Sequence, residues 1–166
     1  MNSKLPGPTI RPASVQDVPV LTDIIRTAYW DVAQRFHLTE QNCPTHPSNC
    51  REAWIQEALA KGIPYFVLES EGHPCGCVAL EHASPEVCYL ERLAVLPDVR
   101  QRGYGRALVT HVLDKAKALQ VQHVDIAIIA EYTELRDWYR TLGFADVRRA
   151  SFEQHPFDVL FMSIAV

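Results

Sequence analysis

Residues 100–108 read RQRGYGRAL and combine residue types that bind anions. Three arginines surround two glycines, directly before a helical pattern. A helix N-terminus presents unpaired backbone N–H groups and the positive end of the helix dipole. Glycines let such a backbone approach a ligand without a Cβ clash. Arginines at this end oppose the dipole, and a bound phosphate would relieve that conflict. The residues alone leave two interpretations, a phosphate site and a solvated glycine turn.

Two known nucleotide-binding loops do not match this segment. A dinucleotide fingerprint needs a third glycine at position 108, where the chain has Leu108, and needs its glycines directly after a strand. A phosphate loop of the Walker type ends in Gly-Lys-Ser/Thr, and the segment lacks that ending. Both types of loop are therefore excluded.

A carboxylate lies in the strand predicted just before the turn. In residues 87–95 the odd positions suit a buried face except for Glu91. Burying an unpaired carboxylate is costly, and a β-bulge near Glu91 and Arg92 would aim the side chain elsewhere. Such bulges gather beside active sites. The alternative is a surface ion pair of Glu91 with Arg92 or another arginine.

Cysteines and a histidine gather between the first two predicted helices. The run NCPTHPSNC holds Cys43, His46 and Cys50, and the run HPCGC adds Cys75 and Cys77. Neither run has the Cys-x2-4-Cys spacing usual for zinc, so no metal site is predicted. The total of five cysteines is odd, which argues against a disulfide framework and favours a reducing compartment.

Hydrophobic periodicity predicts the elements that position these residues. Helices are expected at 15–36, 51–61, 105–120 and 134–142, and strands at 9–11, 65–70, 75–82, 87–95, 123–130, 145–152 and 159–164. The strand at 123–130 is apolar on both faces, which predicts burial on both sides. Antiparallel strands come first, a strand–helix–strand crossover follows and a hairpin ends the chain. The predicted fold is a mixed α/β (α+β) sheet with a right-handed crossover.

Composition limits the classes of protein to which the chain can belong. Its 166 residues suit one domain over 1–166. The formal net charge of −4 lacks the basic footprint of a nucleic-acid-binding protein. No apolar run approaches the roughly 18 residues of a membrane span, and the N-terminus lacks the apolar core of a secretory signal. A cytoplasmic protein with no nucleic-acid and no membrane partner is expected.

The glycine turn and its flanking segments resemble the GNAT superfamily of N-acetyltransferases. RQRGYGRAL resembles the motif that cradles the pyrophosphate of acetyl-CoA, and Arg100, Gly103 and Gly105 match it. ERLAVLPDV resembles the family's fourth strand, and WYRTLGF resembles its next motif, in the right order over about residues 87–147. The resemblance implies a single GNAT domain with a mostly antiparallel sheet of about six or seven strands, one parallel crossover and about four helices. It also implies acetyl-CoA as co-substrate.

The resemblance assigns roles to single residues. The thioester end of acetyl-CoA would lie along the backbone of Leu93, Ala94 and Val95. The pyrophosphate would be bound by Arg100, Gln101, Arg102, Gly103, Tyr104, Gly105 and Arg106. Tyr139 matches the tyrosine that protonates the departing CoA thiolate in many members, although packing in an apolar helix stripe also explains it. The acceptor amine would lie near Tyr29, His46 and Asn49, because the loop between the first helices lines that pocket in the family.

The acceptor amine must lose a proton before it attacks, because a lysine-like amine has a pKa of about 10.4. The sequence does not decide which group takes up this proton. Tyr132 stands where many members have an Asn that contacts CoA. Ala127 stands where some ribosomal-protein acetyltransferases have a Glu. The base is therefore Glu91, Glu131 or water, while a backbone N–H would stabilise the thioester oxygen.

The expected function is acetyl transfer from acetyl-CoA to a primary amine by direct attack in a ternary complex, with a small molecule as acceptor. One alternative is a protein N-terminal or lysine acetyltransferase, and another is a CoA-binding regulatory module without catalysis. An acyl relay on Cys43 or Cys50 is a weaker idea. The sequence leaves open the identity of the acceptor and the preferred acyl-CoA. It also leaves open the oligomeric state, for which a homodimer is one option. Arg148 and Arg149 are expected on a solvated face.

Overall fold

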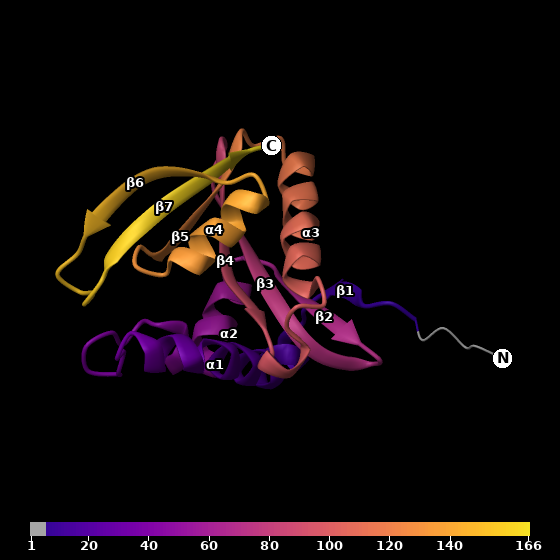
Figure 1. Ribbon diagram of the computed structural model, residues 1–166. Coiled ribbons are helices and arrows are strands. Elements are labelled where there is room, and N and C mark those ends of the chain that lie inside the picture. Colours follow the sequence, from indigo (N-terminus) through magenta and orange to yellow (C-terminus); the bar gives the residue numbers. More distant parts are fainter. Residues whose placement is uncertain (1–5) are drawn as a thin grey trace.

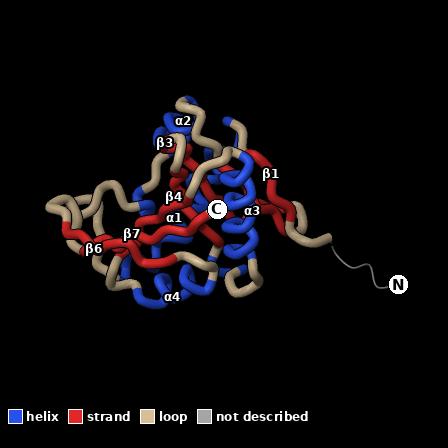
Figure 2. The backbone as a smooth tube through the Cα atoms, turned by 90° about the horizontal axis from the view of Figure 1, so that it is seen from above, coloured by secondary structure: helices blue, strands red, loops and turns tan. Residues whose placement is uncertain are grey.

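A seven-stranded mixed sheet runs through the computed structural model, which describes residues 6–166 (Figure 1). Its strands are β1 (Thr9–Pro12), β2 (Tyr65–Ser70), β3 (His73–Ser84), β4 (Val87–Val95), β5 (His123–Ile129), β6 (Ala145–Ser151) and β7 (Asp158–Ala165). They lie in the order β1-β2-β3-β4-β5-β7-β6, so β1 and β6 form the two edges (Figure 2). Only β4 and β5 pair in parallel. The predicted mixed, mostly antiparallel sheet with one parallel crossover is confirmed.

Four α-helices in the described residues cover the two faces of the sheet (Figure 1). They are α1 (Val18–Arg35), α2 (Glu52–Ala60), α3 (Tyr104–Ala118) and α4 (Thr133–Thr141). Helices α1 and α2 pack on one face, and α3 and α4 on the other. None of these helices is both long and apolar enough to cross a membrane. The predicted helices are confirmed, although the first begins with a separate 3-10 turn at Val15–Asp17.

A small polar network anchors the start of α1. The carboxylate of Asp17 accepts hydrogen bonds from the backbone N–H of Ser14 at 2.8 Å and from the guanidinium of Arg11 at 2.8 and 2.9 Å. The hydrogen bonds from Arg11 are the main reason that the pKa of Asp17 is lowered to about 2. Pro19, at the second position of α1, loses no helical hydrogen bond there. The C-terminal half of α1 is thereby held over the sheet, where it lines the candidate site.

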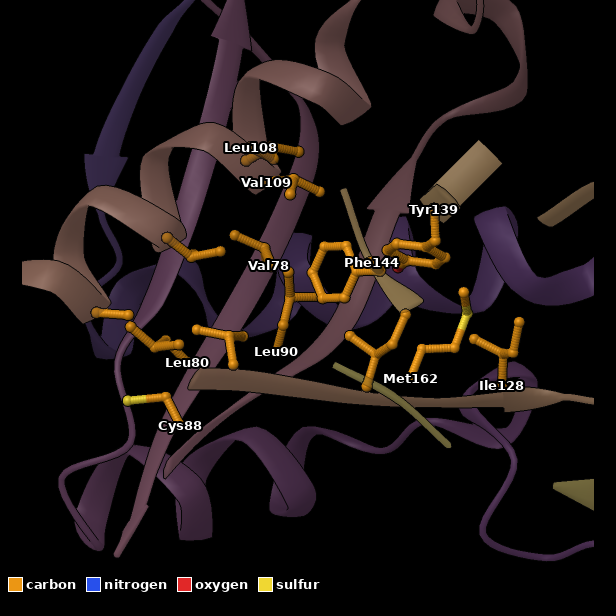
Figure 3. Close-up of a cluster of buried hydrophobic side chains, with 14 of the residues drawn as sticks. Val78, Leu80, Cys88, Leu90, Leu108, Val109, Ile128, Tyr139, Phe144 and Met162 are labelled. Carbon is orange, nitrogen blue, oxygen red and sulfur yellow. The ribbon is translucent and has the colours of Figure 1, made fainter. Parts of the chain in front are cut away.

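Two large apolar clusters hold the layers together, and a small third one joins Ala33 of α1 and the loop after it to Ile129 of β5. The larger lies beneath α3 and α4 and includes Val78, Leu90, Leu108 and Met162 (Figure 3). The smaller of the two large clusters lies beneath α1 and α2, over β2, β3 and the end of β4. Helices α1 and α2 therefore cover only part of their face of the sheet.

The face predicted to be buried in the first half of β4 is wrong. Cys88 and Leu90 are buried in the cluster beneath α3, whereas Tyr89 is 42% exposed. The odd positions at this end of β4 point toward the opposite, α1 side of the sheet. Periodicity groups the residues by face only up to the bulge, because Leu93 and Val95 beyond it pack against the cluster beneath α3, while Ala94 packs beneath α1.

The bulge predicted in β4 is confirmed. β3 pairs Ala79 with Glu91 and Cys77 with Ala94, so three steps along β4 oppose two along β3. Arg92 takes up the extra residue with a φ of 51°, in the left-handed region that residues other than glycine rarely adopt. The bulge therefore interrupts the regular alternation of side chains between Glu91 and the residues that follow it in β4.

The parallel strands β4 and β5 separate soon after they meet. They pair over three positions, the last of which joins Tyr89 to Asp125. Beyond that point Ala127 is exposed, whereas Ile129 on the same face is buried against Ala33 of α1, so the predicted burial of β5 on both sides is wrong at Ala127. This part of the sheet is left uncovered because α1 and α2 pack over β2 and β3.

Candidate active site

The turn predicted to bind an anion forms the N-terminus of α3. Gly103 precedes the helix with a φ of 82°, in the left-handed region that favours glycine. Gly105 lies in the first turn of the helix, where an added Cβ would come within 3.3 Å of the ring of Trp138. The first N–H groups of α3 have no partner within the helix and are bordered by little side-chain bulk.

The three arginines of the turn have different surroundings. The guanidinium of Arg100 donates to backbone carbonyls of α1 and β4 at 2.7 and 3.2 Å and pairs with Asp31 at 2.8 Å. Arg100 therefore joins α1 to the end of β4 and positions the turn. Arg102 and Arg106 are exposed and form no hydrogen bond or ion pair with any residue from 6 to 166. The positive charge available to an anion comes from these two side chains.

Replacing Arg100 by Gln is expected to lower the free energy of unfolding by about 1 to 2 kcal/mol, because two carbonyl oxygens lose a charged donor. Urea denaturation measures this change. Arg102→Gln is the matched control, expected to stay within about 0.5 kcal/mol of the wild type because its side chain is solvated. An Arg100→Gln variant as stable as the control would contradict the positioning role.

A cavity of about 400 Å³ lies against the turn. Every residue predicted to bind the donor lines it except Arg102: these are Leu93, Ala94, Val95, Arg100, Gln101, Gly103, Tyr104, Gly105 and Arg106. Helices α1 and α4 supply the opposite wall, which includes Trp138. The hydroxyl of Tyr104 is engaged at 2.8 Å with that of Ser70, and the residue is buried, so it contributes mainly backbone to the site.

A second cavity of about 750 Å³ shares a wall with the first. Tyr29, Val32, Tyr132 and Leu135 line both cavities. The floor of the second cavity is the face of β4, β5 and β7 that α1 and α2 leave uncovered. The loops that follow α1 and β6 complete its walls. We call the first space the donor cavity and the second the acceptor cavity.

Glu91 lies on the wall of the acceptor cavity. Burial, and then the neighbouring carboxylate of Glu81, raise the pKa of Glu91 to about 7. The ion pair considered with Arg92 does not form, because the Arg92 guanidinium donates to the hydroxyl of Tyr65 at 3.1 Å and lies 5.3 Å from the ring of Trp54. A carboxylate whose pKa is near neutrality is well matched to accept a proton at physiological pH.

The three residues predicted to contact the acceptor are placed differently. The hydroxyl of Tyr29 donates to the carbonyl of Leu93 in the β4 bulge at 2.9 Å. His46 is buried in the wall of the acceptor cavity, and its Nδ1 accepts from the backbone N–H of Ser48 at 3.3 Å. Burial lowers the pKa of His46 to about 4, so the imidazole is neutral near pH 7. Asn49 lies outside the lining, and its amide donates to a backbone carbonyl of its own loop at 3.1 Å.

Tyr139, the predicted acid, lies in the core and is not among the lining residues of either cavity. Its ring centroid is 4.9 Å from that of Trp138 and 5.3 Å from that of Phe144 (Figure 3). Burial raises the pKa of the phenol well above its ordinary value, with Tyr29 as a smaller contributor, so the hydroxyl keeps its proton. The hydroxyl forms no hydrogen bond with the described part of the chain.

Other residues on the cavity walls were not predicted. Asp125 lines the acceptor cavity and lies 2.7 Å from Nδ1 of His123. The available signal was a carboxylate at an inward position of an apolar strand, as with Glu91. Glu131, an alternative base, lies outside both cavities and pairs with Arg149 at 3.0 Å.

All five cysteines are buried thiols without disulfides. Sγ of Cys43 lies 3.7 Å from Nδ1 of His155 in the acceptor cavity, and Cys50 is completely buried beneath α1. Burial raises the pKa of both thiols, and a thiol is a much weaker nucleophile than a thiolate. This argues against an acyl relay. No group of three or more His, Cys, Asp or Glu residues between 6 and 166 is arranged to hold a metal ion.

Comparisons with known proteins agree on one family. The model of the acetyltransferase (GNAT) family matches residues 26–144. An amino-acid acetyltransferase of Neisseria meningitidis is 30% identical over 138 residues, which make up 82% of this chain but 27% of that protein. The chain thus spans about a quarter of the length of that relative.

Two further relatives match over most of their length. An uncharacterised N-acetyltransferase of Escherichia coli is 24% identical over 151 residues, covering 89% of this chain and 88% of that protein. A phosphinothricin acetyltransferase of Sinorhizobium meliloti, solved in complex with acetyl-CoA, has a TM-score of 0.75 at 18% identity over 97% of this chain and 89% of its own. At that identity the structural match shows the fold alone.

Proposed function

The chain belongs to the acetyltransferase (GNAT) family, and we propose that residues 1–166 act as one domain that transfers an acetyl group from acetyl-CoA to a primary amine. The amine attacks directly in a ternary complex, and it belongs to a small molecule. One observation carries this proposal: a helix N-terminus flanked by glycines and arginines and a carboxylate with a raised pKa lie on two cavities that share a wall. In the proposal acetyl-CoA occupies the donor cavity and the amine occupies the adjacent acceptor cavity.

The donor cavity suits the charge and shape of acetyl-CoA. The N–H groups at the start of α3 and the unpaired Arg102 and Arg106 suit a pyrophosphate. From there the cavity follows the backbone of residues 93–95, beside the point where β4 and β5 separate. In the proposal the pantetheine lies along this backbone, and a backbone N–H of β4 stabilises the thioester oxygen as negative charge develops on it.

The proposed reaction removes two protons from the acceptor nitrogen and adds one to the departing sulfur. The ionised carboxylate of Glu91 takes a proton from the acceptor's ammonium, directly or through a water molecule. The nitrogen forms a bond to the acetyl carbon and loses its second proton to water, and the carbon–sulfur bond breaks. The phenol of Tyr139 gives its proton to the departing thiolate. Tyr139 suits this role because burial keeps it protonated and its hydroxyl has no partner in residues 6–166 that would compete.

Replacing Tyr139 by Phe is expected to lower kcat about tenfold and to leave the stability nearly unchanged. A thiol has a reference pKa of about 8.5, so its thiolate leaves readily and the acid contributes at the low end of the usual range. Steady-state kinetics measures kcat, and urea denaturation confirms that the Phe ring still fills the core. Tyr132→Phe is the comparison, because Tyr132 lines both cavities. If kcat falls only in Tyr132→Phe, the acid is Tyr132 and not Tyr139.

The proposed activity is tested by release of CoA thiol from acetyl-CoA in the presence of a panel of amines. The panel includes polyamines, short peptides and amino acids, the last because the Neisseria relative is named an amino-acid acetyltransferase. Other acyl-CoA donors are compared with acetyl-CoA in the same assay. Thiol release that depends on a small amine is the expected result. Tight binding of CoA with no turnover on any amine would instead favour a regulatory CoA-binding module.

A protein N-terminus or lysine side chain is the second candidate acceptor. Its support is the size of the acceptor cavity, whose volume of about 750 Å³ exceeds what a simple amine requires. A preference for peptides over the corresponding free amines in the same panel would establish it. The five free thiols also support our proposal that the protein works in the reducing cytoplasm.

A further inference from the structure

Arg148 lies on the wall of the acceptor cavity, at the end formed by β6 and β7. The register places it directly opposite Phe161, and its guanidinium carbon is 4.2 Å from the centroid of that ring. Phe161 in turn pairs with Ala127 on the floor of the cavity. The ring supports the guanidinium through a cation–π contact, which leaves the donor N–H groups free.

The two neighbouring arginines of β6 have opposite surroundings, because successive residues of a strand point to opposite faces. Arg149 faces away from the acceptor cavity and pairs with Glu131 at 3.0 Å and Asp158 at 2.9 Å. The guanidinium of Arg148 forms no ion pair or hydrogen bond with any described residue, although it is exposed to the cavity. The expectation of a solvated face for both arginines does not account for this difference.

Carboxylates and an arginine lie at different ends of the acceptor cavity. Glu91 and Asp125 come from β4 and β5, whereas Arg148 comes from β6. The strand order places three strand spacings between β4 and β6, and because β4 and β5 separate before Glu91, their backbones lie more than about 14 Å apart there. The long Arg148 side chain shortens that span but does not remove it. Aromatic side chains of His155, Phe157 and Phe161 also line this cavity.

We propose that Arg148 is an anion subsite of the acceptor cavity and selects amines that carry a carboxylate several bonds from the reacting nitrogen. This inference rests on the proposed function, since it names the class of acceptor for the same cavity. The guanidinium binds the carboxylate through two parallel hydrogen bonds while the amine lies beside Glu91. A simple α-amino acid, in which one carbon separates amine and carboxylate, is too short to reach both ends.

The test compares two acceptors that differ only in charge, 6-aminohexanoate and 6-aminohexanamide, in the complete chain with saturating acetyl-CoA. The expected kcat/KM of the wild type is about tenfold higher for the carboxylate, the equivalent of about 1.4 kcal/mol. In Arg148→Gln the ratio of the two values falls to about one. Arg148→Lys, which keeps the charge but loses the paired hydrogen bonds, retains part of the preference.

Arg149→Gln is the matched control, because it removes the same charge from the next residue on the opposite face. It should retain the tenfold ratio. A wild type without preference, or a preference that survives in Arg148→Gln, would overturn the anion subsite.

Failure of the proposed function gives a different result, because neither acceptor is then acetylated by any variant. In that case calorimetry with 6-aminohexanoate decides on the subsite alone. If 6-aminohexanoate binds the wild type but not Arg148→Gln, the anion subsite is supported. If it does not bind the wild type, the anion subsite is rejected.

Discussion

Replacing Glu91 by Gln is expected to lower kcat about 100-fold, because the amine loses the group that takes up its proton. The amide has the same shape as the carboxylate, so the binding of acetyl-CoA should not change. The pH profile gives the more specific result. The wild-type kcat should fall as the pH drops through about 7, where Glu91 becomes protonated, and this fall should be absent from Glu91→Gln.

Glu81→Gln provides the control for that profile. The carboxylate of Glu81 helps to raise the pKa of Glu91, and it lies outside the lining of both cavities. Removing its charge should lower the pKa of Glu91 and move the fall in kcat to lower pH. Rates of Glu91→Gln within about threefold of the wild type across the pH range would assign the base to water or to Asp125.

The same substitution should make the protein more stable at alkaline pH. Between pH 4.5 and about 7 the unfolded chain ionises Glu91 while the folded chain keeps it protonated, so wild-type stability falls over that interval. Glu91→Gln escapes this loss. Its free energy of unfolding should exceed that of the wild type by about 2 kcal/mol at pH 8 and equal it near pH 4, as measured by urea denaturation. Glu91 would then lower the stability of the fold while it supports turnover, as expected of a residue whose role is functional.

Replacing Gly103 by Val is expected to weaken the binding of acetyl-CoA at least about 100-fold, or about 2.8 kcal/mol. A β-branched residue is strained at a φ of 82°, so the backbone must shift and the N–H groups at the start of α3 lose their orientation. The side chain also occupies the space through which a phosphate approaches. Isothermal titration calorimetry with acetyl-CoA and CoA measures the change, which should be equal for both ligands because they share the pyrophosphate.

Gly62→Val separates this effect from loss of stability. Gly62 follows α2 with the same φ of 82°, has nothing within 4 Å of an added Cβ, as at Gly103, and lies outside both cavities. Both variants should lose about 1 to 2 kcal/mol of stability from the strained backbone. Only Gly103→Val should lose affinity. Normal affinity in both would show that this turn does not bind the pyrophosphate.

The local parts of the site were predictable because their signals lie within a few residues. Gly103 before an amphipathic helix marks the turn, and the apolar positions of α3 mark its buried face. The bulge in β4 was also predicted, although from the premise that Glu91 shares a buried face, whereas Tyr89 on that face is 42% exposed. These inferences needed only backbone geometry and the desolvation of one carboxylate.

The rest depends on contacts between distant segments. The three arginines of the turn look equivalent in the sequence, yet Arg100 donates to the carbonyl of Ala28, 72 residues away. Arg148 and Arg149 are adjacent and chemically alike, and only the pairing of β6 with β7 gives one to the cavity and the other to an ion-pair network. The exposure of Ala127 follows from how far α1 and α2 extend over the sheet, which periodicity within β5 does not encode.

The central claim is that donor and acceptor occupy adjacent cavities at the same time. It is tested most directly by initial rates over a grid of acetyl-CoA and amine concentrations, with the acetylated amine identified by mass spectrometry. Double-reciprocal lines that intersect are predicted, because both substrates must be bound before transfer. Direct attack would be contradicted by parallel lines together with protein acetylated at Cys43 or Cys50 after incubation with acetyl-CoA alone. The absence of any acetylated amine would contradict the proposed activity itself.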